Sequence, residues 1–387
     1  MADTISPEFH LPTEIYIQQE ISKNSAEIAS KFGERVVIVT VYPDFEIYQK
    51  SLSVIYNYFK RIKIGCIIYD ELPESPTTED IDAAVSFIKK TGFDLIIGFG
   101  GIESINSAKA IALLTNNHIF CYDLLSTNEI LKPPANFITM PAYPSFGFEI
   151  TPMFYVKEIH NLTNQVYHNL KLYPLASIID PELSLQIPAD KILKTSTSAL
   201  AVATESVIST MNNDVINTFA LKAIDFTFRN LPVAYKEQKN IVPRTNLSTA
   251  SIMAGISFSV AFLSISLAIA LAISSKTDID IETAVSIILP HIMEFNLTTS
   301  PGKYVQMSKV MGEDVRDITV IEASIKAVEA VRKLLIDIDI PQRLSMYKIN
   351  QSQFKDIAEL AYSYPFINNT PRRISRSEIE TILISAS

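Results

Sequence analysis

The first half of the chain alternates apolar runs of strand length with helical patterns. In chain order, the strand and helix pairs are 34–40 with 52–62, 64–69 with 80–90, and 94–98 with 104–114. Strands that are apolar on both faces are typical of a parallel sheet covered by helices. The pattern predicts an α/β domain with a parallel sheet of the dinucleotide-binding type.

The character of the sequence changes near residue 182. Beyond it the chain reads almost wholly as helices, at 189–211, 217–229, 252–273, 281–295, 321–337, 353–363 and 376–385. A chain of 387 residues also exceeds the size at which one core usually stops growing. We predict two domains, an α/β domain at 1–182 and an all-helical domain at 183–387.

Charge and composition exclude some classes of function. The net charge is −9 with lysine and arginine scattered, whereas nucleic-acid binders carry a basic stripe. Cys66 and Cys121 lie in apolar stretches, and residues 1–16 lack a basic region followed by an apolar one. The run 252–273 is long enough to span a bilayer, but its serines favour a helix buried in a soluble domain. We expect a cytoplasmic protein that binds neither nucleic acid nor membrane.

A glycine-containing turn, GFGGIESINSAK at 98–109, joins the third strand to its helix. Turns of this kind bind phosphate by close approach of the backbone and by N–H groups at the helix start. Ile102 and Glu103 stand where the backbone should be bare. A β-branched side chain hinders the approach, and a carboxylate repels an anion by a few kcal/mol at short range.

Several segments resemble the iron-containing, or group III, alcohol dehydrogenase family, whose relatives include glycerol dehydrogenase and dehydroquinate synthase. They are LPTEIYI at 11–17, the stretch 75–101, SAKAIALL at 107–114, IIDPEL at 178–183 and ILPHIMEFN at 288–296. The resemblance runs nearly end to end. It implies a dehydroquinate synthase-like fold, with a nicotinamide nucleotide and a divalent metal ion between the two domains.

The resemblance places the family's phosphate turn, G-G-G-S-x-x-D-x-A-K, on residues 100–109. Its third glycine, serine and aspartate are replaced by Ile102, Glu103 and Asn106, and Val41 stands where many members carry the acid that binds ribose. The residues that the resemblance implies for a vestigial nucleotide site are Gly98, Gly100, Gly101, Ser104, Asn106, Lys109 and Gly147. Alternatively, the turn is shifted by one residue so that Gly98 takes a glycine role, and nucleotide binding survives in altered form.

The metal ligands that the resemblance implies are one aspartate and three histidines. Their positions are filled by Ser198, Val202, Leu267 and Ile281. This set offers one neutral oxygen where a metal ion needs imidazole and carboxylate. We therefore expect no iron or zinc and no cofactor, with NAD(P) binding possible but weakened.

These replacements predict a catalytically inactive member of the family that is kept as a binding, regulatory or assembly protein. The alternative is an atypical or metal-independent NAD(P)-dependent oxidoreductase that uses the cleft between the domains. Its titratable groups would be Glu103, Lys109, Glu149 and Glu205. Members of the family commonly associate, so we also expect a homo-oligomer and allow for a protein partner.

Overall fold

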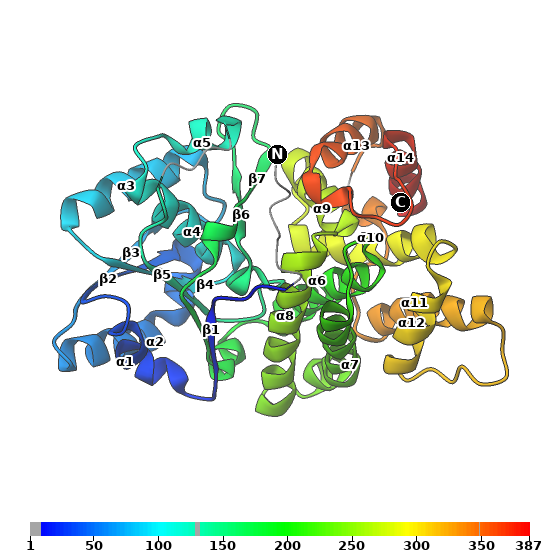
Figure 1. The fold of residues 1–387 in the computed structure, drawn as a ribbon, viewed down its shortest axis with the longest axis horizontal. Coiled ribbons are helices and arrows are strands. Elements are labelled where there is room, and N and C mark those ends of the chain that lie inside the picture. The colour runs from blue at the N-terminus through cyan, green and yellow to red at the C-terminus, as the bar shows by residue number, and fades with distance from the viewer. Residues whose placement is uncertain (1–8, 128–131, 348) are drawn as a thin grey trace, which may run out of the picture.

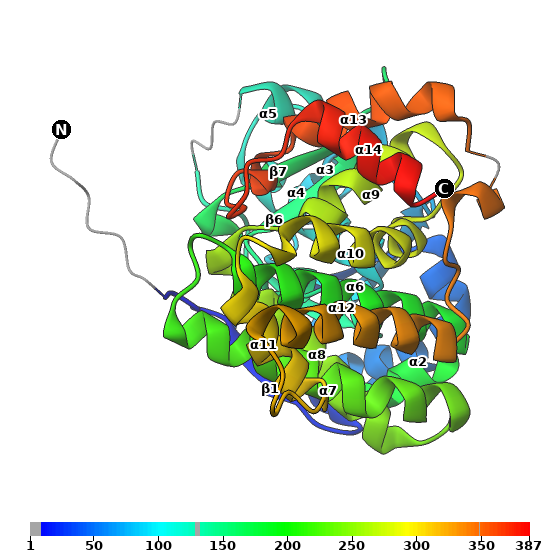
Figure 2. The ribbon, with the colours of Figure 1, turned by 90° about the vertical axis from the view of Figure 1, so that its right-hand side faces the viewer.

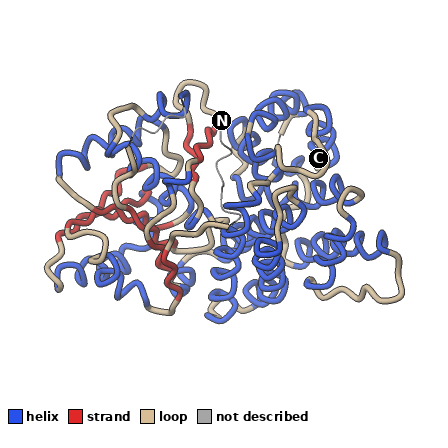
Figure 3. The backbone as a smooth tube through the Cα atoms, in the orientation of Figure 1, coloured by secondary structure: helices blue, strands red, loops and turns tan. Residues whose placement is uncertain are grey.

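The computed structural model describes residues 9–127, 132–347 and 349–387 (Figure 1). Within these described ranges, six parallel strands form the sheet of the N-terminal half, in the order β1-β8-β5-β4-β2-β3. Figure 3 shows the strands gathered on one side of the molecule and helices filling the other. The strands are β1 (Glu14–Ile17), β2 (Arg35–Val41), β3 (Gly65–Leu72), β4 (Leu95–Gly100), β5 (Phe137–Pro141) and β8 (Ala176–Ile179).

Alternating residues of the central strands face two different cores. Val36 and Ile38 of β2 belong to the large core that also contains Tyr48 of α2 (Tyr42–Arg61). Val37 and Val39 belong to a second core under α3 (Thr78–Thr91) and α4 (Ile102–Asn116). This double burial explains the continuous apolar runs and confirms the predicted parallel sheet.

Short elements complete the sheet domain. They are the helices α1 (Ser25–Ala29) and α5 (Cys121–Thr127) and the antiparallel hairpin of β6 (Met153–Lys157) and β7 (Asn164–His168). The predicted boundary at residue 182 lies within a 3-10 turn, Pro181–Gln186, between β8 and the first long helix of the second half. The change in sequence character therefore coincides with the end of the last sheet strand.

The second half is helical, as predicted (Figure 2). Its helices are α6 (Ala189–Ile208), α7 (Asp214–Lys236), α8 (Ile241–Ala261), α9 (Ile265–Lys276), α10 (Ile281–Leu297), α11 (Pro301–Val310), α12 (Val320–Asp337), α13 (Phe354–Ser363) and α14 (Arg376–Ser385). Sequence analysis did not identify α11, which is short and has few buried apolar residues to mark a face. Capping boxes at Thr319 and Ser375 fix where α12 and α14 begin.

The uncharged run, expected as one helix, is two helices. Phe262 adopts a left-handed backbone with φ of 40°, and the Ser264 side chain accepts a hydrogen bond from the Leu267 N–H to start α9. The helices α8 and α9 are bent by 99° relative to each other. In the described part of the chain no single helix is long and apolar enough to cross a membrane. The bent pair of α8 and α9 together has the length and composition of a membrane span, by these two criteria alone.

The two domains touch backbone to backbone at Gly147 and Gly255. Gly147 has φ of 84°, a conformation that favours glycine, and it lies against Gly255 in the middle of α8. A Cβ atom on Gly255 would lie 2.6 Å from the Gly147 Cα and 2.9 Å from a side-chain carbon of Ile150. Both positions therefore require the absence of a side chain.

We expect the Gly255→Ala substitution to destabilise the protein by about 1–3 kcal/mol, because the added methyl group overpacks this contact. Urea denaturation followed by circular dichroism measures the change. Gly302→Ala is the matched control, since a Cβ atom there meets nothing within 4 Å. Equal denaturation midpoints for the two variants would show that the contact can relax without loss of stability.

Candidate functional site

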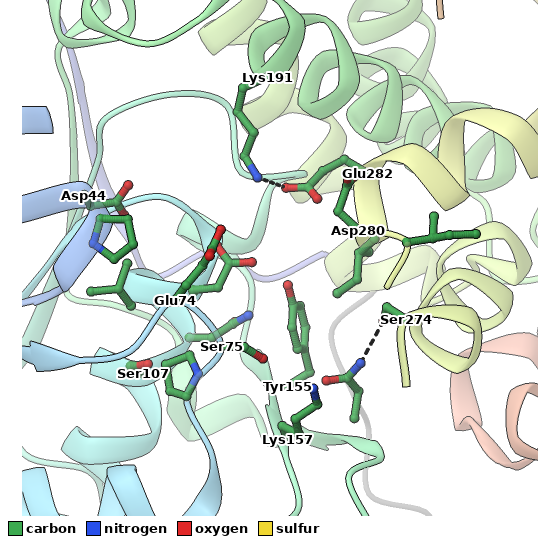
Figure 4. A pocket seen from close by; sticks show the side chains of 18 of the residues that line it. Asp44, Glu74, Ser75, Ser107, Tyr155, Lys157, Lys191, Ser274, Asp280 and Glu282 are labelled. Carbon is green, nitrogen blue, oxygen red and sulfur yellow. Dashed lines mark hydrogen bonds and ion pairs between the residues drawn. The ribbon is translucent and has the colours of Figure 1, made fainter. Parts of the chain in front are cut away.

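A cavity of about 650 Å³ lies between the two domains. Residues that follow β2, β3, β4 and β5 line one side of it, and the starts of α6 and α10 line the other. The chain order reverses between β2 and β4, so this is the switch point of the sheet, where open α/β sheets bind ligands at their carboxyl ends. The cavity is therefore the candidate functional site (Figure 4).

The start of α4 is hydrogen-bonded to a carboxylate of the same chain. Asp44, in the first turn of α2, accepts a hydrogen bond of 2.6 Å from the Gly101 N–H and one of 2.8 Å from the Ser104 hydroxyl. Burial raises the pKa of Asp44, although these two hydrogen bonds act in the opposite direction. Asp44 thus takes a hydrogen bond that a phosphate oxygen accepts at comparable helix starts.

Tyr143 covers the same turn from the other side. A Cβ atom on Gly101 would overlap the Tyr143 hydroxyl, and one on Gly100, whose φ is 129°, would overlap the Asp44 carboxylate. Ile102 packs into the large core instead of standing over the turn. The side chains that cover the glycine turn are therefore Asp44 and Tyr143. Ile102, which was predicted to hinder the approach of a phosphate, does not cover the turn.

Three charged side chains from three elements meet in the cavity. The Lys191 ammonium, at the start of α6, forms an ion pair of 2.7 Å with Glu282 at the start of α10. Glu103 projects from the first turn of α4 and interacts electrostatically with both. Burial raises the pKa of Glu103 to about 8, Lys191 lowers it and Glu282 raises it. Glu103 therefore holds a proton near neutral pH.

Two polar side chains at the cavity lack hydrogen-bond partners within the described residues. Asn106 of α4 is 2% exposed, and neither its Oδ1 nor its Nδ2 has a partner. The Tyr155 hydroxyl of β6 also has none, and Figure 4 shows this ring pointing between the groups around Glu74 and Asp280. Buried polar groups in folded proteins are nearly always satisfied, so these atoms mark places where a ligand or water binds.

The seven candidate nucleotide residues are used in different ways. Asn106 lines the cavity, whereas Gly100, Gly101 and Ser104 form the turn that Asp44 and Tyr143 cover. Gly98 lies in β4 against Ala108 of α4, and Gly147 packs on α8. The Lys109 ammonium is fully buried and donates to the carbonyl oxygens of Phe148, Thr151 and Met153.

The other candidate titratable groups also have structural partners. Burial lowers the pKa of Lys109 to about 7, while Glu149 raises it. Glu149 accepts a hydrogen bond of 2.7 Å from Ser251 of α8. Glu205 accepts from the backbone N–H groups of Ile265 and Ser266, and therefore caps the start of α9. Among the four, Glu103 is the one that lines the cavity.

The residues at the four aligned metal positions do not fit an iron or zinc ion. Val202 of α6, Leu267 of α9 and Ile281 of α10 are buried apolar side chains. Ser198 donates its hydroxyl to the Lys194 carbonyl at 3.0 Å. Within the described ranges, no three His, Cys, Asp or Glu residues are grouped so that they could hold a metal ion.

Sequence analysis missed several residues of the site. Lys191 and Glu282 carried a signal that could have been used, because Lys191 precedes Ser198 by two helical turns and Glu282 follows Ile281 directly. Asp44 and Tyr155 carried none, since their place depends on how α2 and β6 pack against the sheet. The ion pair joins residues that are 91 positions apart.

Comparison with known proteins matches both halves of the chain. Residues 12–181 match the family described as iron-containing alcohol dehydrogenase, and residues 192–387 match the C-terminal part of the Fe-containing alcohol dehydrogenase family. The chain is 25% identical to 1,3-propanediol dehydrogenase of Klebsiella pneumoniae over 354 residues, which is 92% of each chain. It is 23% identical to NAD-dependent methanol dehydrogenase of Bacillus methanolicus over 319 residues, 82% of this chain and 84% of the other.

The fold agrees with a solved structure of the same group. The crystal structure of 1,3-propanediol oxidoreductase superposes with a TM-score of 0.93 at 24% identity, covering 98% of this chain and 99% of that one. Together with the family matches, this superposition confirms the predicted resemblance and the predicted fold class.

The same comparisons contradict the prediction that no cofactor is bound, with NAD(P) binding weakened and iron and zinc absent. The matched family is iron-containing by its description, and the Bacillus methanolicus relative is named as NAD-dependent. The prediction inferred loss of binding from replacements in the glycine turn, at the ribose position Val41 and at the four metal positions. Changed side chains at one turn do not remove a cavity of about 650 Å³ at the switch point of the sheet.

We expect Glu103→Gln to change how stability depends on pH. Because burial raises the pKa of Glu103 from 4.5 to about 8, the folded state binds more protons than the unfolded state between these values, and stability falls as pH rises through them. The variant lacks this loss. The difference in melting temperature, variant minus unsubstituted protein, should therefore increase by a few degrees as the pH is raised from 5 to 8.5.

Differential scanning fluorimetry across this pH range measures the effect. The described titratable groups that face Glu103 remain in the variant; they are Asp44, Tyr143, Tyr155, Lys191 and Glu282. Glu329→Gln, on the exposed side of α12, is the control and should give a constant difference. A constant difference for Glu103→Gln as well would mean that Glu103 is ionised throughout this range.

Proposed function

Because the chain belongs to the iron-containing alcohol dehydrogenase family, we propose that it keeps the cleft between its domains as a ligand-binding site and does not act as an alcohol dehydrogenase. The proposal rests on the side chains in the cleft. They provide a cavity with charged and unpartnered polar groups, but no arrangement suited to metal-assisted hydride transfer.

The observation that carries the proposal is the set of side chains at the four aligned metal positions. In metal-assisted reactions a divalent ion polarises the substrate oxygen and stabilises the charge that develops on it by several kcal/mol. Here Val202, Leu267 and Ile281 are packed into the core, and the hydroxyl of Ser198 is used within its own helix. These residues supply no comparable interaction with a substrate alkoxide.

The nucleotide is one of the ligands that this proposal admits. A relative is named as NAD-dependent, and the cavity volume lies within the range of small-molecule sites. A phosphate at the start of α4 would meet Asp44 and Tyr143, so a nucleotide that uses this turn displaces both side chains. The proposal therefore states that the protein does not catalyse hydride transfer from an alcohol. It makes no claim about nucleotide binding, which a binding measurement with NAD or NADP decides.

A second candidate function is supported by the cluster of Glu103, Lys191 and Glu282. An ammonium group can polarise a substrate oxygen, and a carboxyl group with a pKa of about 8 can exchange a proton near neutral pH. A metal-independent NAD(P)-dependent oxidoreductase would use Lys191 and Glu103 in these roles. Homo-oligomer formation and a protein partner, expected from the sequence, stay predictions under either function.

Purified protein assayed with NAD or NADP and with 1,3-propanediol or methanol tests these functions. We expect no nicotinamide reduction above the blank, with or without added Fe²⁺ or Zn²⁺, because the metal positions lack ligands. Turnover that depends on added metal would overturn the proposal. Turnover without metal that is lost in Glu103→Gln and kept in Glu329→Gln would instead establish the metal-independent oxidoreductase.

A further inference from the structure

We propose that the cavity between the domains binds a small organic cation that carries a primary ammonium group. The inference deepens the proposed function and rests on it, because it names the class of ligand for the same cleft. Charge, unpartnered polar atoms and aromatic side chains in the cavity each support it independently.

Acidic side chains outnumber basic ones in the cavity wall. Among the described residues, seven acidic residues and two lysines line it, in a chain whose net charge is −9. Glu282 is paired with Lys191 and Asp280 with Lys194, and Glu103 holds a proton near neutral pH. The remaining negative charge comes from Glu74, Asp190 and Asp278, with Asp44 beside the start of α4. A cleft lined by one sign of charge focuses the electric field and raises the local concentration of the opposite ion. The wall therefore attracts cations.

The unpartnered atoms point to a ligand with hydrogen-bonding groups. Asn106 is almost fully buried, and both its Oδ1 and its Nδ2 lack partners among the described residues. The Nδ2 needs an acceptor such as a water molecule, and the Oδ1 accepts from a donor such as an ammonium. The Tyr155 hydroxyl, on a residue 7% exposed, can also accept from one. Leaving such groups unsatisfied costs free energy, and a ligand that donates to both oxygen atoms regains it.

Aromatic side chains give the third support. Tyr143 and Tyr155 line the same cavity, and aromatic rings attract organic cations over their faces. Glu103 lies in the first turn of the same helix as Asn106, so a carboxylate and a carboxamide oxygen are presented by adjacent turns of α4. Carboxylate, amide and aromatic groups together are a common chemistry for recognising amines.

Cation binding should be linked to the titration of Glu103. In the free protein Glu103 faces five titratable groups of the described residues, and burial raises its pKa to about 8. They are Asp44 from α2, Tyr143 from the loop after β5, Tyr155 from β6, Lys191 from α6 and Glu282 from α10. A bound ammonium favours the ionised carboxylate, so the ligand displaces a proton below that pH. Affinity should then rise as pH increases toward 8.

The probe is 1,4-diaminobutane, with 1,4-butanediol as a neutral analogue of the same length. Isothermal titration calorimetry and melting temperature are measured at constant ionic strength, so that general screening of an acidic protein is held fixed. We expect saturable binding and a raised melting temperature with the diamine and neither with the diol. Binding at pH 8.5 should be roughly tenfold tighter than at pH 7, as the ionised fraction of Glu103 grows.

Variants test the assignment to this cavity. Glu103→Gln should weaken diamine binding by roughly tenfold at pH 8.5 and abolish its pH dependence, since each unit of pKa linkage is a factor of ten. Asn106→Ala is the second variant and should weaken binding while keeping the pH dependence. Glu329→Gln, which removes the same charge from the surface of α12, should leave both unchanged.

The outcomes separate the two proposals. No diamine binding, or equal binding in the Glu103 and Glu329 variants, overturns the cation site, whether or not the protein turns over alcohols. A melting-temperature increase with NAD or NADP but not with the diamine also overturns it. Diamine binding that follows Glu103 and Asn106 supports the site, and it does so even if alcohol oxidation is detected and the proposed function fails.

Discussion

The hydrogen bonds that Asp44 accepts at the start of α4 determine what the cleft can do. A helix start with exposed N–H groups is a ready anion site, and here the Gly101 N–H faces a carboxylate from α2. The Ser104 hydroxyl donates to the same oxygen. With Tyr143 on the other side of the turn, the chain itself occupies the Gly101 N–H and the Ser104 hydroxyl and covers the turn that would approach a phosphate. The rest of the cleft is then free to recognise other chemistry.

That chemistry is supplied by the facing domain. Lys191 and Glu282 lie at the starts of α6 and α10, the helices that carry three of the aligned metal positions. Ser198 and Val202 follow Lys191 in α6, and Ile281 directly precedes Glu282 in α10. The ion pair fixes a charge between the domains in a cavity where Glu103 titrates near neutral pH. Acidic residues thus approach the cavity from both domains, which is the basis for the inferred preference for a cation. Asp44, Glu74 and Glu103 come from the sheet domain, and Asp190, Asp278, Asp280 and Glu282 come from the helical domain.

The sequence was sufficient for the fold and insufficient for the site. Double burial of β2 and β4 leaves continuous apolar runs, so these strands were predicted closely. Most helices of the second half were predicted near their observed ranges, but α11 was not identified and α8 begins at residue 241, before the expected start at 252. The break at Phe262 was missed because a left-handed residue other than glycine has no mark in the sequence. Asp44 was missed because its role comes from packing α2 beside a turn 57 residues away. Replacements at the metal positions were readable, but they did not establish whether a cofactor binds.

The contact of Gly147 with Gly255 has a consequence for movement between the domains. Most interdomain contacts are made by side chains, which can slide or change rotamer, whereas here two main chains meet with no side chain between them. Any opening of the cleft that preserves this contact must be a rotation about it and cannot be a translation of one domain along the other. The two glycines would then act as the pivot between the domains. The width of the cleft would depend on the angle between the two domains at this contact.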